Sequence, residues 1–179
     1  MSTLEMLRAD ERDSMAVLDI WLDAANWMRA QGIDQWMPDR FNLSEVAACL
    51  TGGKELFLLK ENGIAAGTFY IKWSDSLMWE DGRAASAGYI HRLAVGRNHH
   101  GRGIGALMLD WAEQYIAESG KAMIRLDCMA DNTRLNTYYS ERGFQLVTRI
   151  DTRGWSANLF EKEAKLRCSK EALLLEAGG

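Results

Sequence analysis

The stretch of chain around residues 93–105 carries the groups best suited to binding an anion. An apolar run ends at residues 93–95, and after a short polar stretch the chain reads His100-Gly101-Arg102-Gly103-Ile104-Gly105. A helical pattern follows directly. The start of a helix leaves about four backbone N–H groups unpaired and carries about half a positive charge. Because glycines let the backbone approach a ligand closely, this stretch predicts a phosphate or pyrophosphate site.

Two other interpretations of this stretch are weaker. Gly101-x-Gly103-x-x-Ala106 also fits a dinucleotide-binding fingerprint, with Asp127 about twenty residues further on. However, residues 96–100 separate the strand from the first glycine, and too little chain remains for a doubly wound sheet. His99 and His100 do not form a metal pair, since adjacent side chains point apart and no cysteine or carboxylate stands at ligand spacing. We therefore expect no metal site.

A second group of residues agrees with the first. Asn132 is followed seven residues later by Tyr139, and Gly143-Phe144 comes after that. The two blocks resemble the pyrophosphate loop, R/Q-x-x-G-x-G/A, and the N-x6-Y-x3-GF element of the GNAT superfamily of N-acetyltransferases. His100 departs from the arginine or glutamine of that loop. The resemblance covers about residues 54–151 well and the first 50 residues only in the order of elements.

The resemblance implies an acetyl-CoA-dependent N-acetyltransferase with the GNAT fold, an α/β fold with a central mixed, mostly antiparallel sheet flanked by helices. It also implies which residues bind the cofactor: Leu93, Ala94, Val95, His100, Gly101, Arg102, Gly103, Ile104, Gly105, Asn132 and Tyr139. In the family, the pantetheine arm runs beside the strand at 93–95 and a backbone N–H there meets the developing oxyanion. Acetyl-CoA would be the cosubstrate, and the transfer needs no metal.

Two residues are our candidates for proton transfer. Tyr139 stands where the family keeps a tyrosine acid, and a positioned phenol can protonate a leaving thiolate. Its neighbour Tyr138 is expected to pack. The string YIHRLAV resembles the arylalkylamine acetyltransferases, which place a histidine where His91 stands, and this makes His91 the first choice for the base. Glu80 is the reserve candidate. Simple alternation would place His91 on the same strand face as 93 and 95.

Acceptor specificity is expected in the first helix, the loop after it and the 74–83 loop. These lack cofactor motifs yet contain aromatic and acidic residues. Our candidates for contact with the amine are Trp36, Trp79, Glu80 and Asp127, and the carboxylates of Asp34, Asp75 and Asp81 would also suit an ammonium group. Packing in the core remains the simpler reading for any one tryptophan.

Composition excludes several classes of protein. The net charge of the 179 residues is −4, which gives no basic footprint for nucleic acid and weakly favours cationic small molecules. No apolar run is long enough to cross a membrane, and the start of the chain does not resemble a secretory signal, so we expect a cytoplasmic protein. The scattered Cys49, Cys128 and Cys168 argue against disulfides.

Hydrophobic periodicity and turn residues predict the elements that must position these groups. We expect strands at 3–8, 54–60, 64–73, 89–95, 122–129, 144–150 and 155–162, and helices at 11–30, 44–51, 104–118 and 133–142. They form one domain over 1–179, in which 1–50 shapes the acceptor site and 165–179 is a helical or frayed tail. Ser44 is the expected cap of the second helix.

The acceptor itself is open at this stage. The motifs favour a small-molecule amine, but a protein or peptide N-acetyltransferase would share all of them. A non-catalytic acetyl-CoA sensor is a third alternative, disfavoured because both Tyr139 and His91 are present. Either a monomer or a homodimer is compatible with the sequence.

Overall fold

The sheet is organised around a tight hairpin. Strands β2 (Glu55–Glu61) and β3 (Ile64–Lys72) are joined by Asn62 and Gly63. Both turn residues have positive φ, 52° and 79°, as a two-residue hairpin turn requires. Aliphatic and aromatic side chains alternate between the two faces of this hairpin, so both faces need a covering layer.

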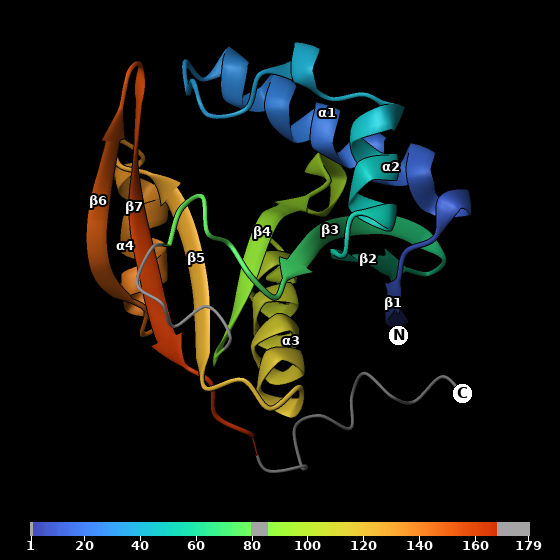
Figure 1. Ribbon diagram of the computed structural model, residues 1–179. Helices are drawn as coiled ribbons and strands as arrows, with labels where there is room; N and C mark the ends of the chain where they lie inside the picture. Colours follow the sequence, from blue (N-terminus) through green and yellow to red (C-terminus); the bar gives the residue numbers. More distant parts are fainter. Residues whose placement is uncertain (1, 80–85, 168–179) are drawn as a thin grey trace.

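The computed structural model describes residues 2–79 and 86–167. It places seven strands in one sheet of order β1-β2-β3-β4-β5-β7-β6 (Figure 1). The remaining strands are β1 (Leu4–Arg8), β4 (Ala87–Val95), β5 (Met123–Met129), β6 (Gln145–Thr152) and β7 (Trp155–Glu163). All neighbouring pairs are antiparallel except β4 and β5, which are parallel. The expected mixed, mostly antiparallel sheet is confirmed.

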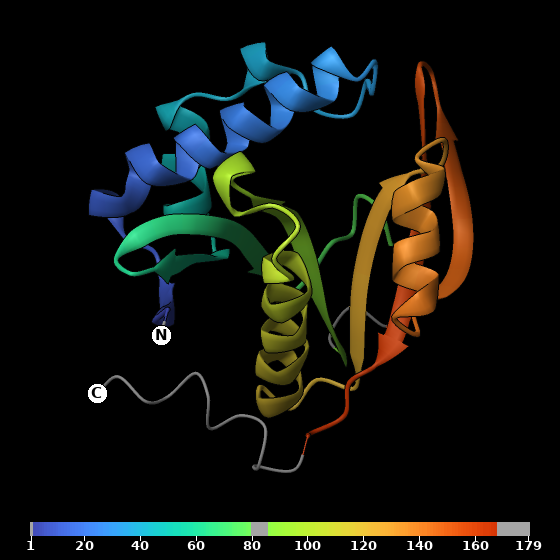
Figure 2. The ribbon, with the colours of Figure 1, turned by 180° about the vertical axis from the view of Figure 1, so that it is seen from behind.

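Helices cover the two faces of the sheet separately (Figures 1 and 2). Helices α1 (Ser14–Ala30) and α2 (Leu43–Thr51) bury Trp21 and Val46 against one face. Helices α3 (Ile104–Glu118) and α4 (Thr133–Glu141) lie on the other face, where Met108 and Tyr139 join a larger core. Short 3-10 turns are at Glu11–Asp13, Pro38–Arg40 and Arg97–His99.

Two details of the expected elements were wrong. The 11–30 segment begins as a 3-10 turn, and α-helix starts only at Ser14. Asn42, rather than Ser44, caps α2, because its side chain accepts the Glu45 N–H at 3.1 Å and the helix therefore starts one residue earlier. Residues 165–167 contain no helix, and the rest of the expected tail lies outside the described residues.

Among residues 2–79 and 86–167, no helix is both long and apolar enough to span a membrane. Cys49 and Cys128 are buried free thiols.

Candidate active site

The parallel pair β4 and β5 separates shortly after it forms. Their register joins only Ala87–Tyr89 to Met123–Arg125, and beyond that point the two strands diverge (Figure 1). Within residues 2–79 and 86–167, the edge of β4 that faces β5 therefore has no strand partner from residue 90 onward. Unpaired strand edges present rows of N–H and C=O groups to any extended ligand.

A β-bulge at Arg92 changes the direction of the side chains in the same stretch. Tyr70 is paired with His91 and Thr68 with Ala94, so β4 places Arg92 and Leu93 opposite the single residue Phe69. Arg92 has φ of 50°, which is unusual for a residue with a side chain. Its guanidinium lies over the Trp21 ring, 4.7 Å from the ring centroid.

The bulge contradicts the expected alternation along β4. His91 stacks on Tyr70, on the α1 side of the sheet, whereas Leu93 and Val95 pack against the core under α3. Simple alternation predicted one shared face, and nothing in the local sequence marks the extra residue. As a result, the base candidate and the end of the strand address different sides of the sheet.

The turn after β4 has the shape of an anion cradle. Gly101 and Gly103 have φ of 74° and 76°, and a Cβ added at either would meet nothing within 4 Å. Gly103 stands at the N-cap of α3, and no side chain caps that helix. Ile104 is buried and Gly105 lies against Val95, which fixes the helix start beside the end of β4. The exposed amides of this turn are therefore free to hold a phosphate.

The His100 side chain is exposed but folds back onto its own loop. Nε2 lies 2.8 Å from the Val95 carbonyl oxygen and Nδ1 lies 3.1 Å from Arg97 Nη1. Because a guanidinium only donates and a carbonyl only accepts, these two contacts fix the tautomer with hydrogen on Nε2. Both ring nitrogens are thus used within the loop.

A buried carboxylate ties this loop to the hairpin. Glu61, 5% exposed, accepts hydrogen bonds from Ser2 Oγ at 2.6 Å and from both terminal nitrogens of Arg102, one at 2.7 Å. His99 Nδ1 lies 2.7 Å from the same carboxylate. These partners, Ser2 first and then Arg102 and His99, lower the pKa of Glu61 to about 2. Sequence reasoning missed this residue, because no motif connects positions 61 and 102.

Helix α4 brings Asn132 and Tyr139 to the other side of the gap between β4 and β5. Asn132 caps the helix by accepting the Leu135 N–H at 3.1 Å, and it donates to Gln35 Oε1 at 3.4 Å. Tyr139 is packed between Phe144 and Phe160, and burial raises the pKa of its hydroxyl. Within the described chain that hydroxyl has no hydrogen-bond partner.

On the α1 side, His91 belongs to a cluster of titratable groups. Its Nε2 lies 3.0 Å from Asp75 Oδ2, and its ring stacks on Tyr70 with centroids 5.1 Å apart. Lys72 Nζ lies 2.9 Å from the other Asp75 oxygen. Burial alone would raise the pKa of Asp75, but His91 and Lys72 outweigh it and hold the pKa below its ordinary value.

Asp127 lies close to this cluster but makes none of its pairs. It is on β5, facing away from the core residues Leu126 and Cys128, and the charges of His91, Asp75 and Lys72 all act on it. Burial raises the pKa of Asp127; the charges of His91 and Lys72 oppose this effect and that of Asp75 adds to it, and the pKa stays above its ordinary value. Among the residues that the structure describes, no hydrogen bond or ion pair compensates this carboxylate.

The remaining acceptor candidates differ in their exposure to solvent. Trp36 packs against Phe41 at the edge of the α1 core, and Asp34 is exposed. Trp79, a candidate for contact with the amine, is only 5% exposed and follows the simpler reading of core packing, since it packs on Tyr89 and on the Arg125 guanidinium. Glu80 and Asp81 lie outside the described residues.

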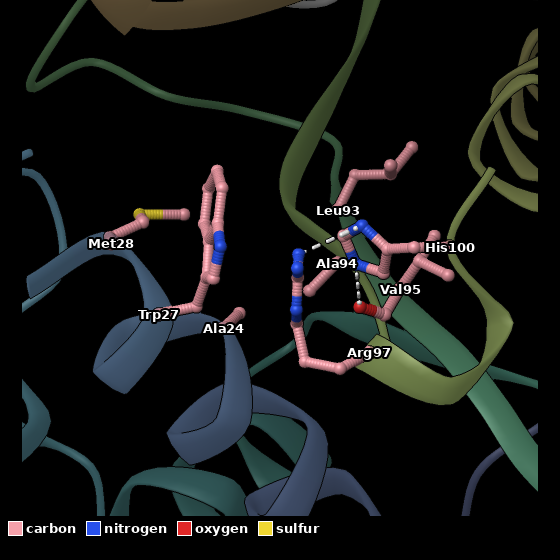
Figure 3. A pocket seen from close by; sticks show the side chains of 8 residues that line it. All are labelled: Ala24, Trp27, Met28, Leu93, Ala94, Val95, Arg97 and His100. Atoms are coloured by element: carbon pink, nitrogen blue, oxygen red, sulfur yellow. Dashed lines mark hydrogen bonds between the residues drawn. The ribbon is translucent and has the colours of Figure 1, made fainter. Parts of the chain in front are cut away.

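A cavity of about 200 Å³ lies between α1 and the end of β4 (Figure 3). The α1 helix supplies Trp27 and Met28, which project toward Arg97 and His100 on the facing turn. The other lining residues are Ala24, Leu93, Ala94 and Val95. Sequence reasoning identified the β4 residues and His100 but missed the α1 residues and Arg97. No group of three or more possible metal ligands occurs within 2–79 and 86–167.

Comparisons with known proteins agree with this arrangement. Residues 21–144 match the model of the acetyltransferase (GNAT) family. The N-acetyltransferase YesJ of Bacillus subtilis (strain 168) is 32% identical over 157 residues, which are 84% of this chain and 85% of YesJ.

Solved structures show the same fold. A GNAT-family acetyltransferase of Listeria monocytogenes has a TM-score of 0.74 at 27% identity, over 89% of this chain and 94% of that one. YncA of Salmonella typhimurium, a putative acetyltransferase solved with acetyl-CoA, has a TM-score of 0.68 at 15% identity, over 95% and 99% of the two chains. The family match and the YesJ relationship together show that this chain belongs to the GNAT family of acetyltransferases.

Proposed function

We propose that this enzyme transfers the acetyl group of acetyl-CoA to the primary amine of a small molecule. The observation that carries the proposal is the arrangement along β4. The phosphate cradle follows its C-terminal end, and the cluster of His91, Asp75 and Asp127 lies just before its bulge. A donor and an amine could therefore meet at the strand from opposite sides.

The residues present fit acetyl-CoA. The cradle at Gly101 and Gly103 is open and its helix start is uncapped, which suits a pyrophosphate. The unpaired edge of β4 at 93–95 suits an extended pantetheine arm. Two proteins of similar fold were solved with this ligand or its product, YncA with acetyl-CoA and the PaiA N-acetyltransferase of Thermoplasma acidophilum with coenzyme A. When bound, acetyl-CoA supplies a thioester whose acyl carbon accepts the amine.

His91 is proposed as the base. Asp75 lies against Nε2, which holds the ring in one orientation and leaves Nδ1 to accept a proton from the acceptor ammonium, directly or through one water. Asp127 is proposed to attract that ammonium, because it is a half-buried carboxylate that makes no hydrogen bond or ion pair within the described residues. The neighbouring Lys72 is paired with Asp75, so its charge acts on Asp127 only from a distance.

Tyr139 is proposed as the acid. Tyr139 lies on α4, and its hydroxyl, which has no hydrogen-bond partner within the described residues, is protonated and able to donate when a thiolate forms nearby. A backbone N–H of β4 in the stretch 93–95 is proposed to donate to the carbonyl oxygen as negative charge develops there. Each step thus has one group of this chain assigned to it.

A small acceptor is favoured by charge. The chain has a net charge of −4, and the acceptor side around His91 contains carboxylates at 75 and 127. A protein acceptor is the alternative, and a similar fold does occur in the ribosomal-protein-S18-alanine N-acetyltransferase of Escherichia coli, at 16% identity. An identity that low reports the fold and leaves the acceptor open.

A thiol-release screen tests the proposal. Acetyl-CoA is mixed with simple amines, polyamines, aminoglycosides, amino acids and short peptides, and free CoA is measured. We expect saturable release with one class of small amine. Release only with peptides would replace the acceptor class, and tight acetyl-CoA binding without any release would indicate a sensor.

A further inference from the structure

The turn from β4 to α3 contains four basic residues whose surroundings differ. They are Arg97, His99, His100 and Arg102. Backbone amides and glycines explain how this turn accommodates a phosphate group, but they do not say which side chain adds positive charge. The contacts of the four residues answer that question by elimination.

Two of the four are paired with the same carboxylate. The buried Glu61 receives both terminal nitrogens of Arg102 and contacts His99. An Arg–carboxylate fork of this kind is among the stronger hydrogen-bonded pairs in proteins. Releasing Arg102 toward a phosphate would leave the buried Glu61 without its only guanidinium partner among the described residues, which opposes the movement.

His100 is also used within the loop. Its ring accepts from Arg97 and donates to the Val95 carbonyl, so no N–H is left for a ligand. His100 stands at the first position of the glycine-rich turn, yet its ring connects the end of β4 to the turn by hydrogen bonds.

Arg97 is different from the other three. Its backbone N–H donates to Asp23 at 2.7 Å, which anchors the residue to α1. Its guanidinium lies over the Trp27 ring, 4.6 Å from the centroid, and Nη1 contacts His100, the residue directly before Gly101 (Figure 3). Within 2–79 and 86–167, no carboxylate pairs with this guanidinium.

We propose that Arg97, held by Trp27 and His100, is the side-chain cation that binds the pyrophosphate of the acyl donor. The proposal rests on the proposed use of acetyl-CoA. Arg97 would supply positive charge from the start of the turn, where both ring nitrogens of His100 are already used within the loop. Three residues position Arg97. Asp23 holds its backbone N–H, the Trp27 ring lies against the plane of its guanidinium, and His100 contacts one guanidinium nitrogen.

Binding measurements with truncated donors test this assignment without needing an acceptor. Calorimetry gives the Kd of CoA, dephospho-CoA and pantetheine for the wild type and for Arg97→Ala, Arg97→Lys and Arg102→Gln. We expect Arg97→Ala to weaken CoA and dephospho-CoA by about 10-fold or more, the usual effect of losing a charged hydrogen bond. Pantetheine, which has no pyrophosphate, should change less than about twofold, and Arg97→Lys should lie between.

Arg29→Ala is the matched control, since it removes an exposed charge two residues after Trp27 but outside the cavity lining. Its CoA affinity should stay near wild type. An Arg97→Ala loss that vanishes with dephospho-CoA assigns the contact to the 3′-phosphate and overturns the proposal. The proposal is also overturned if Arg97→Ala weakens pantetheine binding as much as CoA binding, or if Arg102→Gln weakens CoA binding more than Arg97→Ala does. A change confined to the KM of the acceptor would overturn it as well. A wild type that binds no CoA would instead refute the proposed function.

Discussion

The two sides of β4 are built by different means. The donor side is a turn of consecutive residues, 96–105, in which positive-φ glycines and an uncapped helix form the surface. The acceptor side collects His91 from β4, Asp75 from a loop and Asp127 from β5, and its character comes from side-chain charge.

This difference separates a part of the site that depends on backbone geometry from a part that depends on electrostatics. The part that depends on backbone geometry can be formed by any residue type without a bulky or strained side chain, provided that the glycines remain. The second depends on which groups lie within a few ångströms of one another, and its pKa shifts have opposite signs for two neighbouring carboxylates. We therefore expect substitutions on the donor side to abolish binding and those on the acceptor side to change rate, pH dependence or stability.

Gly103→Glu should have the largest effect, the loss of stabilisation by acetyl-CoA. At 100 times Kd the wild type should gain about 2.7 kcal/mol, or about 5–10 °C in Tm. The glutamate places bulk and negative charge in the cradle, at a position with φ of 76°. Thermal unfolding with and without acetyl-CoA measures this.

Gly120→Glu is the control for backbone strain, because Gly120 has φ of 74° and open space but follows the opposite end of α3. It should keep the ligand-induced shift. An undiminished shift in Gly103→Glu would contradict the cradle.

Tyr139→Phe should come next, with a fall in kcat of about 10²–10⁴ if the hydroxyl protonates the thiolate. The ring stays in its packing against Phe144 and Phe160, so folding and acetyl-CoA binding should survive. Single-turnover measurement of CoA release isolates the chemical step. Tyr138→Phe on the same helix is the matched control, and a larger loss there would reverse the assignment.

The fold was predictable because its signals are local. The Asn62-Gly63 turn, the helix pattern after Gly103 and the strand at β5 each lie within one short stretch of sequence. The donor turn was predictable for the same reason. The Arg92 bulge was not, since an extra residue in a strand leaves no change in composition, and the contact of Trp79 with Arg125 was not, because the two residues are distant in the sequence.

The side chains of the site were predictable only as residue types. His91 and Asp127 could be named, but the contact of His91 with Asp75 required the strand and the loop to be placed in space. Likewise, Arg102 was expected to be an available cation, and only the structure shows that Glu61 occupies it. Long-range pairs of charges decide such roles, and a single sequence does not reveal them.

His91→Ala tests the acceptor side of β4 through the proposed base. If His91 is the base, kcat/KM at neutral pH should fall by about 10²-fold, the acid limb of its pH profile should flatten, and the Kd of CoA should stay unchanged. The structural reason is that β4 turns His91 away from the donor face at the bulge. A pH profile identical to that of the wild type would remove His91 from the base role.

Asp127→Asn should have the smallest effect on the free protein. Unlike the other substitutions, it should be favourable, because it should increase the stability of the fold. Burial and Asp75 raise the pKa of Asp127 above its value in the unfolded chain. The folded state therefore binds more protons than the unfolded state, and stability falls as pH rises from the unfolded pKa through the folded one. Above that window the wild type has an uncompensated carboxylate, which asparagine removes.

We expect the Tm of Asp127→Asn to exceed that of the wild type by a few degrees at pH 7–8 and to converge with it as the pH falls below the unfolded pKa, where the carboxyl is protonated in both states. Asp75→Asn is the contrasting variant. The pKa of Asp75 is lowered by His91 and Lys72, so its charge stabilises the fold above the unfolded pKa, and its loss should lower the Tm at neutral pH. Because an ammonium acceptor would neutralise Asp127, the same substitution should raise the KM for the amine. A variant that is less stable at pH 7 and binds the amine normally would show that Asp127 is compensated in the free protein, and the acceptor side would lose its proposed ammonium site.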